Sequence, residues 1–410
     1  MTYIERAITP VLKKRAETSK CLLVTGARQV GKATVIKHEF PEYNRANFDD
    51  RLTRLQARED PKLFFLNNPC PLLIDEVQKE NGILEEIKLR ADESEKKGQY
   101  ILSGSQKLEL MKNMGDSLVG RISVTELLGL SLREIHGVAF NKHFIPNDEY
   151  IDSREKELKD YTDLWETIHK GSYPELYDSE REWQEYYSSY VATYLERDIN
   201  ELIASDSITF TKFLTAVAAR TGEMLSYSNI ASEVGVSEPT IKKWISILER
   251  TGIVYILQPY SASTLKRAIR TPKLYFRDTG LACYLTRWLT ADALKCSAVA
   301  GSIFETFVVS EVIKSYVNEG KDYRFNIYYY RGKDKAVKGE NEIDLIIEEN
   351  GVLYPVEIKM SGSPKAAMAG TNTVLDKITG KSRGMGVILC LVDKKIYLRE
   401  NLVALPIEYI

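Results

Sequence analysis

Two glycines and a lysine follow the first apolar segment of the sequence and could hold a chain of phosphates. Residues 20–25 read as a buried strand, and the loop after it runs from Gly26 to Gly31 and ends on Lys32. In such a loop the backbone N–H groups turn toward the phosphates, the next helix offers the positive end of its dipole, and the lysine reaches the outer phosphates. The pattern predicts a site for ATP and Mg²⁺ made by Gly26, Ala27, Arg28, Gln29, Val30, Gly31, Lys32, Ala33 and Thr34.

The residue after the lysine departs from the usual pattern of a phosphate loop. A Ser or Thr there normally binds Mg²⁺ through its hydroxyl. This sequence has Ala33 instead and carries the hydroxyl one residue later, on Thr34. That shift turns the side chain by about 100° around a helix. The departure puts Mg²⁺-dependent hydrolysis in doubt more than nucleotide binding.

Two acids end the apolar segment at residues 71–76. This composition is expected of a central parallel strand that presents Asp75 and Glu76 at its carboxyl end. In that interpretation Asp75 holds the metal and Glu76 polarises the water that attacks the outer phosphate. The alternative is a buried strand that ends in a solvated acidic turn.

Four further residues are candidates for sensing the phosphates or for supplying an arginine to them. Ser105 and Gln106 follow the apolar segment at residues 100–104, and Arg121 and Arg197 are candidate arginine fingers, in their own subunit or in a neighbouring one. The alternatives are an ordinary turn after a strand and arginines that form structural ion pairs.

A second group of charged residues lies near the carboxyl end of the sequence. Residues 301–316 predict an amphipathic helix that carries Glu305, and residues 341–347 and 352–359 predict two strands joined by the turn at 349–351. Glu357 and Lys359 are two residues apart and share a face of their strand, and hairpin pairing can bring Asp344 close to them. Solvated charges on an ordinary hairpin are the alternative.

Together these motifs resemble those of a prokaryotic family of AAA-type ATPases with a C-terminal domain of unknown function. The resemblance spans nearly the whole chain and implies an ATPase core, a helical lid, a winged helix and a nuclease-like end. It is carried by residues 26–32, 73–78, 102–106, 120–121 with 126–128, 194–198, 271–276 and 278–281.

The charged residues near the carboxyl end resemble the PD-(D/E)xK nuclease pattern. The resemblance implies that Asp344 and Glu357 bind Mg²⁺ and that Glu305 completes the site. Lys359 would then orient the attacking water or steady the scissile phosphate. A folded domain that only binds DNA or another partner is a further alternative.

Four regions are expected to position these residues. Taken with the resemblance, the motifs predict an α/β fold: a P-loop AAA-type parallel-sheet core at 1–140, a helical lid at 141–205, a winged helix-turn-helix at 206–262, and an α/β restriction-endonuclease-like domain at 263–410. The polar residues 141–157 read as a connection outside the core, and residues 171–174 break the helical region.

The winged helix is predicted from a helix, a glycine turn and a second helix. Ser237 is a good N-cap for the second helix, which is expected to expose Lys242, Lys243 and Trp244. Basic residues just beyond, at 266, 267, 270 and 273, would extend a positive face. Such modules bind DNA but also serve in protein packing, and both uses stay open.

Length and charge set the remaining expectations. The 410 residues exceed one usual domain, and a formal net charge of −2 means that DNA contact needs a local basic face. Five scattered cysteines without metal-ligand spacing, no membrane segment and no secretion signal predict reduced thiols and a cytoplasmic protein.

These features predict a homo-oligomer that binds and hydrolyses ATP. Nucleotide binding or hydrolysis would be coupled to the binding or remodelling of double-stranded or branched DNA. The C-terminal domain would add metal-dependent cleavage of DNA. One alternative is a nucleotide-gated scaffold or switch without efficient hydrolysis or cleavage. Another is a regulator that acts mainly through its winged helix.

Overall fold

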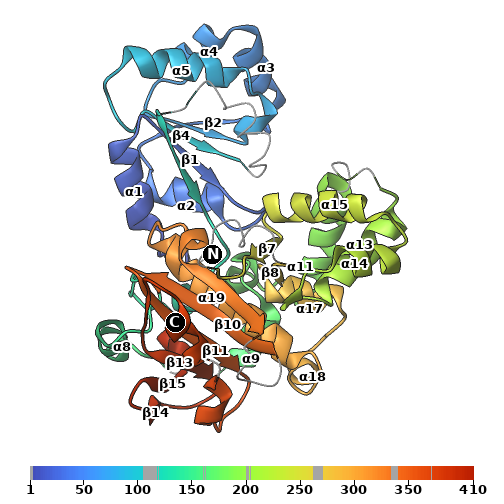
Figure 1. Ribbon diagram of the computed structural model, residues 1–410. Helices are drawn as coiled ribbons and strands as arrows, with labels where there is room; N and C mark the ends of the chain where they lie inside the picture. The colour runs from blue at the N-terminus through green and yellow to red at the C-terminus, as the bar shows by residue number, and fades with distance from the viewer. Residues whose placement is uncertain are drawn as a thin grey trace. The chain divides into compact units, whose positions relative to one another are not determined.

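The computed structural model of the chain (Figure 1) describes residues 3–104, 118, 120–159, 161, 163–199, 203, 205–261, 271–333, 340–370 and 372–410. The side chains of Arg197, Asp198, Lys333 and Glu340 lie outside the described part. The chain divides into two compact units. The first comprises Met1–Leu130, Tyr173–Asp178 and Arg250–Gly252, and the second comprises Ser131–Ser172, Ser179–Glu249 and Ile253–Ile410.

The first unit is built on a parallel sheet of five strands in the order β2-β3-β4-β1-β5. The central strands β1 and β4 are buried throughout, as expected where helices cover both faces of a parallel sheet, whereas the edge strand β2 is polar and mostly exposed. All five strands point the same way, so the residues that follow β1 and β3 meet at the carboxyl edge. The strands are β1 (Cys21–Thr25), β2 (Asn44–Asn47), β3 (Leu72–Asp75), β4 (Tyr100–Ser103) and β5 (Ile122–Glu126).

Short helices connect these strands, and side-chain caps fix where two of them begin. Asp50 accepts a hydrogen bond from Thr53 N at 2.9 Å, and Asp60 accepts one from Leu63 N at 2.9 Å. The helices of this unit are α1 (Thr9–Thr18), α2 (Lys32–Glu39), α3 (Arg51–Glu59), α4 (Pro61–Asn67), the 3₁₀ turn η1 (Val77–Lys79), α5 (Ile83–Glu93) and α10 (Glu175–Asp178).

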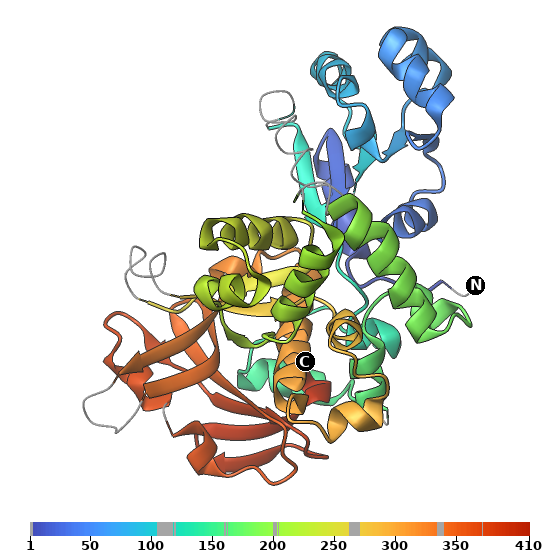
Figure 2. The ribbon, with the colours of Figure 1, turned by 90° about the vertical axis from the view of Figure 1, so that its right-hand side faces the viewer.

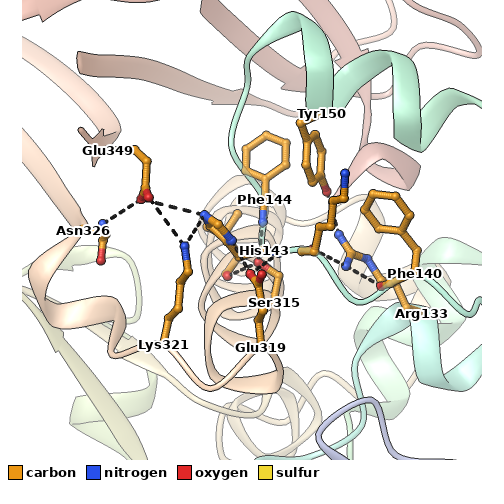
Figure 3. Close-up of polar contacts among 12 residues, drawn as sticks. Arg133, Phe140, His143, Phe144, Tyr150, Ser315, Glu319, Lys321, Asn326 and Glu349 are labelled. Atoms are coloured by element: carbon orange, nitrogen blue, oxygen red, sulfur yellow. Dashed lines mark hydrogen bonds and ion pairs between the residues drawn. The ribbon is translucent and has the colours of Figure 1, made fainter. Parts of the chain in front are cut away.

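The second unit begins with short helices that are fastened to its carboxyl-terminal part. Arg133 is buried and donates hydrogen bonds to the carbonyls of Phe140, at 2.8 Å, and Ile410, at 2.9 Å. His143 N donates to Glu319 at 2.9 Å and Phe144 N to Ser315 at 2.9 Å (Figure 3). These helices are α7 (Leu132–Ile135), α8 (Asp148–Glu155), α9 (Leu164–Lys170), α11 (Trp183–Tyr190) and the π-helix η2 (Val191–Ile199).

Two sequence expectations about this region have different outcomes. Residues 141–157 are not a connection outside the core, because Tyr150, Ile151 and Arg154 of α8 are buried. The helical break at 171–174 is confirmed: α9 ends at Lys170, and Gly171 adopts a positive φ of 86°. The many charged residues of α8 favoured the prediction of a linker, although its apolar residues pack into the core.

Three helices and a small antiparallel sheet in the order β6-β8-β7 form the middle of the second unit. Ser237 caps α15 as predicted, accepting from Thr240 N at 3.3 Å. Trp244 is buried, not exposed, and packs edge-on against Phe213 with 5.1 Å between ring centroids. The elements are α13 (Ser207–Ala218), β6 (Glu223–Met224), α14 (Tyr227–Val234), α15 (Glu238–Arg250), β7 (Val254–Leu257) and β8 (Lys273–Phe276).

The carboxyl-terminal part is a mixed seven-stranded sheet in the order β14-β15-β13-β11-β10-β9, with β12 paired to β11. Helix α19 contacts β11 and β8. Figure 2 shows the strands of this sheet in orange to red. The strands are β9 (Ile327–Lys333), β10 (Glu340–Glu349), β11 (Val352–Lys359), β12 (Ser382–Arg383), β13 (Gly386–Cys390), β14 (Ile396–Arg399) and β15 (Leu402–Pro406). The helices are α17 (Thr279–Leu285), α18 (Ala291–Lys295), α19 (Ala300–Asn318), η3 (Tyr323–Phe325), η4 (Ala366–Ala369), η5 (Asn372–Lys377) and η6 (Ile407–Tyr409).

The predicted hairpin is confirmed. Glu349 pairs with Val352 across the turn, and Asn350 and Gly351 have φ of 51° and 83°, which a type I′ turn requires. Helix α19 is longer than predicted and is not amphipathic, because it is buried on nearly every side.

All five cysteines are free thiols. In the ranges that the structure covers, we find no helix with the length and apolar character needed to cross a membrane.

Candidate functional site

The loop between β1 and α2 has a backbone path that only glycine can follow at one point. Gly26 has φ of 145°, and a Cβ there would lie 2.2 Å from the carbonyl oxygen of Leu127. Gly31 also has a positive φ, of 90°, just before α2 begins at Lys32. The predicted glycines are therefore required by the conformation of the loop.

Lys32 lies under this loop and is buried. Its Nζ donates hydrogen bonds to the carbonyls of Gly26, at 3.1 Å, and Ala27, at 2.8 Å. Burial lowers the pKa of Lys32 to about 8, against the opposing pull of the nearby carboxylates of Glu76 and Asp75. The structure thus brings together the lysine after β1 and the acids after β3, as the sequence predicted.

The two acids are held in place by neighbours that sequence reasoning missed. Oδ1 of Asp75 accepts hydrogen bonds from Glu76 N, at 3.1 Å, and from the hydroxyl of Ser103 at the end of β4. Glu76 accepts a hydrogen bond from Nε2 of Gln78 and has φ of 53°, which is uncommon for a residue other than glycine. Such strained residues concentrate at functional sites.

Two carboxylates among the described residues of the first unit, Asp75 and Glu76, are candidates for holding Mg²⁺. Ala33 is half-buried in the first turn of α2, and Thr34 is exposed on the same helix. Mg²⁺ accepts one or two protein carboxylates together with phosphate oxygens and waters, so Asp75 and Glu76 fit this cation without a hydroxyl at position 33.

Arg6 supports the phosphate loop from behind and was also missed. Its buried guanidinium donates to the carbonyl of Val30 at 2.9 Å, to that of Leu128 at 2.6 Å and to that of Gly129 at 3.4 Å. These bonds tie the loop after β1 to the segment after β5. No local spacing signals them, because the partners are distant in the chain.

The four candidate sensor and finger residues divide into two groups. Ser105, Gln106 and the side chain of Arg197 lie outside the described residues. Arg121 precedes β5, and its carbonyl accepts from Cys21 N at the start of β1, so it lies at the amino edge of the sheet. It binds Asp92, with 3.0 Å between Nη2 and Oδ2. This position excludes Arg121 from the phosphate loop of its own subunit.

The hairpin of the second unit gathers three of the four predicted residues. Nζ of Lys359 lies 2.8 Å from Asp344 Oδ2 and 2.8 Å from Glu357 Oε2, and Ile358 N donates to Asp344 at 2.8 Å. Burial, followed by repulsion from Asp344, raises the pKa of Glu357 to about 8. Oε1 of Glu357 is buried and accepts no hydrogen bond from any described residue. Two carboxylates with one uncommitted buried oxygen fit a divalent cation that keeps several waters.

Glu305 has other partners. Its Oε1 lies 3.0 Å from Nζ of Lys273 and accepts from the hydroxyl of Tyr275 at 2.7 Å. Burial raises the pKa of Glu305, and Lys273 opposes this shift. Within the described ranges, no three or more His, Cys, Asp or Glu side chains are grouped to hold a metal ion. The expected three-acid set is therefore not assembled.

The lysines proposed for DNA differ in their surroundings. Lys242 and Lys243 are both exposed on α15, and Lys242 Nζ lies 2.8 Å from Glu238. Lys273 is buried on β8 and does not extend a positive surface as predicted. Residues 266, 267 and 270 lie outside the described ranges.

The fold and the site of the first unit define an AAA-type P-loop ATPase domain. Residues 18–136 match the AAA_14 family, described as an AAA domain. Residues 161–292 match DUF8612 and residues 300–410 match DUF4143, both described as domains of unknown function. The chain thus carries an AAA domain, which implies nucleotide binding, typically with Mg²⁺, followed by two domains of unknown function.

Two relatives are similar over almost the whole chain. They are uncharacterized protein Mb2031c of Mycobacterium bovis and uncharacterized protein Rv2008c of Mycobacterium tuberculosis. Each is 25% identical over 409 residues, covering 97% of this chain and 82% of the relative.

Two solved structures are more distant. The Walker-type ATPase of Pyrococcus abyssi is 15% identical, with a TM-score of 0.41, over 69% of this chain and 96% of that chain. AMPPCP-bound DnaA from Aquifex aeolicus is 15% identical, with a TM-score of 0.27, over 59% of this chain and 85% of that chain.

Proposed function

We propose that this protein hydrolyses ATP in its first unit and uses the cycle to control DNA in its second unit. One observation carries the proposal: Lys32, Asp75 and Glu76 meet at the carboxyl edge of one parallel sheet. Lys32 would balance the charge of the outer phosphates, Asp75 would hold Mg²⁺, and Glu76 would polarise the attacking water. Mg²⁺, when bound, supplies further charge stabilisation at the phosphates.

The order of elements in the middle of the second unit supports DNA binding. Helices α13, α14 and α15, followed by the antiparallel strands β7 and β8, have the order of a winged helix-turn-helix. Lys242 and Lys243 are exposed on the second helix of the pair and could contact phosphates. The helices before α13 would serve as the lid.

The hairpin site supports metal-dependent cleavage by a restriction-endonuclease-like domain. Asp344 and Glu357 would hold the divalent cation, which supplies Lewis acidity and a polarised water when bound. Lys359, which contacts both acids, would keep them together and meet the charge of the scissile phosphate.

Phosphate release in the presence of Mg²⁺, with and without DNA, tests the ATPase. Replacing Glu76 with Gln should lower turnover by about 100-fold or more while ATP binding is retained. Glu80→Gln, which removes a carboxylate paired with Arg58, is the matched control and should keep most turnover. Full turnover by Glu76→Gln would contradict the proposal.

A gel-shift titration against salt tests the DNA contact. Replacing both Lys242 and Lys243 with Gln should weaken binding and reduce the salt slope by about two, one for each lost phosphate contact. Lys365→Gln removes an exposed lysine of the carboxyl-terminal part and should change neither quantity. Equal affinity of the double variant would place DNA elsewhere.

Linear, flapped and branched DNA incubated with Mg²⁺ or Mn²⁺ tests cleavage. Glu357→Ala should abolish cutting, whereas Glu348→Ala, on the same hairpin but paired with Lys381, should not. Intact DNA in every form would end the nuclease proposal.

A nucleotide-gated switch without efficient hydrolysis is the second candidate, and Ala33 favours it. The hydroxyl usually found after the loop lysine is missing there. ATP binding without phosphate release would support this candidate.

A further inference from the structure

The acid cluster of the second unit is held by two lysines from different elements. Lys359 bridges Asp344 and Glu357 on the hairpin. Lys273, from β8, bridges two other acids: its Nζ lies 3.0 Å from Glu305 and 2.7 Å from Glu342. Four carboxyl groups thus share two ammonium groups, and when all are ionised two negative charges remain, which one divalent cation would balance.

Lys273 is built into this cluster. It is 3% exposed, lies 5.7 Å from the centre of the Tyr329 ring, and sits on the strand that also carries Tyr275, the hydroxyl donor to Glu305. A lysine at this depth is retained where its charge is matched by carboxylates. Both contacts of Oε1 of Glu305 therefore come from β8.

The two halves of the cluster differ in whether a carboxylate oxygen is available to bind a cation. Oε1 of Glu357 is buried without a hydrogen-bond donor among the described residues, so the hairpin half has an oxygen available to a cation. Both halves contain a bridging ammonium group, but in the other half Oε1 of Glu305 already accepts hydrogen bonds from Lys273 and Tyr275 and is not available in the same way.

From these contacts we propose that Lys273 is a positioning residue that keeps Glu305 out of the cation site and thereby sets the site's affinity. This inference rests on the proposed cation site of Asp344 and Glu357. Because β8 belongs to the sheet with β6 and β7, the lysine that limits cation binding is supplied by the DNA-binding module of the same proposal.

Mn²⁺ binding, measured by electron paramagnetic resonance on the full-length protein without nucleotide, tests this inference. An Asp75→Asn background removes the contribution of the first unit. Lys273→Met should bind Mn²⁺ at least about tenfold more tightly, because it removes one positive charge and frees Glu305. Lys273→Arg should stay within about twofold of the parent, since it keeps the charge. Adding Glu305→Gln to Lys273→Met should abolish the gain.

A second variant keeps the test decisive if Lys273→Met does not fold. Glu305→Gln alone removes a nearby negative charge but no ligand while Lys273 holds Glu305, so it should weaken Mn²⁺ binding by less than about tenfold. A loss of tenfold or more would make Glu305 a ligand and overturn the inference. So would unchanged affinity of folded Lys273→Met.

The outcomes separate this inference from the proposed cation site. Tight binding by the parent that Glu357→Ala abolishes, together with no gain in Lys273→Met, would overturn the role of Lys273 alone. Absence of Mn²⁺ binding in the parent and in every variant would overturn both.

Discussion

The hydroxyl of Ser103 donates a hydrogen bond to Oδ1 of Asp75 and so joins the ends of β4 and β3. Strand β4 lies between β3 and β1, so Ser103 stands between the acids and the phosphate loop. The carboxylate keeps its second oxygen, Oδ2, outside this contact, and we infer that Ser103 orients Asp75 toward the metal.

Replacing Ser103 with Ala should therefore impair the metal-dependent step. A hydrogen bond to a charged group contributes about 1.5–3 kcal/mol, so Mg²⁺-dependent turnover should fall by roughly 10- to 100-fold, whereas ATP binding in EDTA should not change. Ser123→Ala, which removes the 2.8 Å hydrogen bond between Ser123 on β5 and Ser19, is the control. A similar loss of ATP binding in EDTA would indicate damage to the loop.

ATP affinity should depend on pH through Lys32. Its pKa is lowered to about 8, so the ammonium group is charged below that pH and loses its proton above it. The triphosphate favours the charged form and raises the pKa in the complex. Affinity should therefore fall as pH rises from 8 to 9, by up to about tenfold, with uptake of a proton on binding.

Calorimetry at pH 7 and 9, in two buffers of different ionisation enthalpy, measures both quantities. Lys32→Arg keeps a charged group at all these pH values and should give a flat profile. A flat profile for the unaltered protein would contradict the lowered pKa.

Replacing Ala33 with Thr should raise Mg²⁺-dependent turnover by about tenfold if the missing hydroxyl limits hydrolysis, since it adds one ligand to the metal. Thr34→Ala should have no effect because Thr34 is exposed on α2. Loss of turnover in Thr34→Ala would instead show that the displaced hydroxyl serves the metal.

Replacing Arg6 with Gln should destabilise the first unit. It would leave the buried carbonyls of Val30 and Leu128 without their charged donor, at a cost of about 2 kcal/mol or more. Hydrogen exchange at the amides of β1 should accelerate accordingly. Arg45→Gln, an exposed arginine on β2, should leave exchange unchanged.

The phosphate loop and the acid pair could be predicted because their signals are local. Gly26, Gly31 and Lys32 lie within a single short loop, and Asp75 and Glu76 directly end an apolar strand. The hairpin turn at Asn350 was predictable for the same reason, since its residue types fix the turn.

The residues that support these sites could not be predicted, because their partners lie far along the chain. Arg6 meets Leu128 across 122 positions, and Lys273 meets Glu305 across 32. The basic residues around Lys273 favour an exposed side chain at that position, and this prediction is wrong. Lys273 is buried and pairs with carboxylates from α19 and β10.

The distribution of the free thiols and indoles gives each unit its own optical or chemical reporter. All four tryptophans, Trp165, Trp183, Trp244 and Trp288, belong to the second unit, whereas buried Cys21 lies in β1 of the first. Tryptophan fluorescence during denaturation therefore follows only the second unit. Modification of Cys21, followed by mass spectrometry, would report the opening of the nucleotide-binding sheet, so the unfolding of each unit can be measured separately.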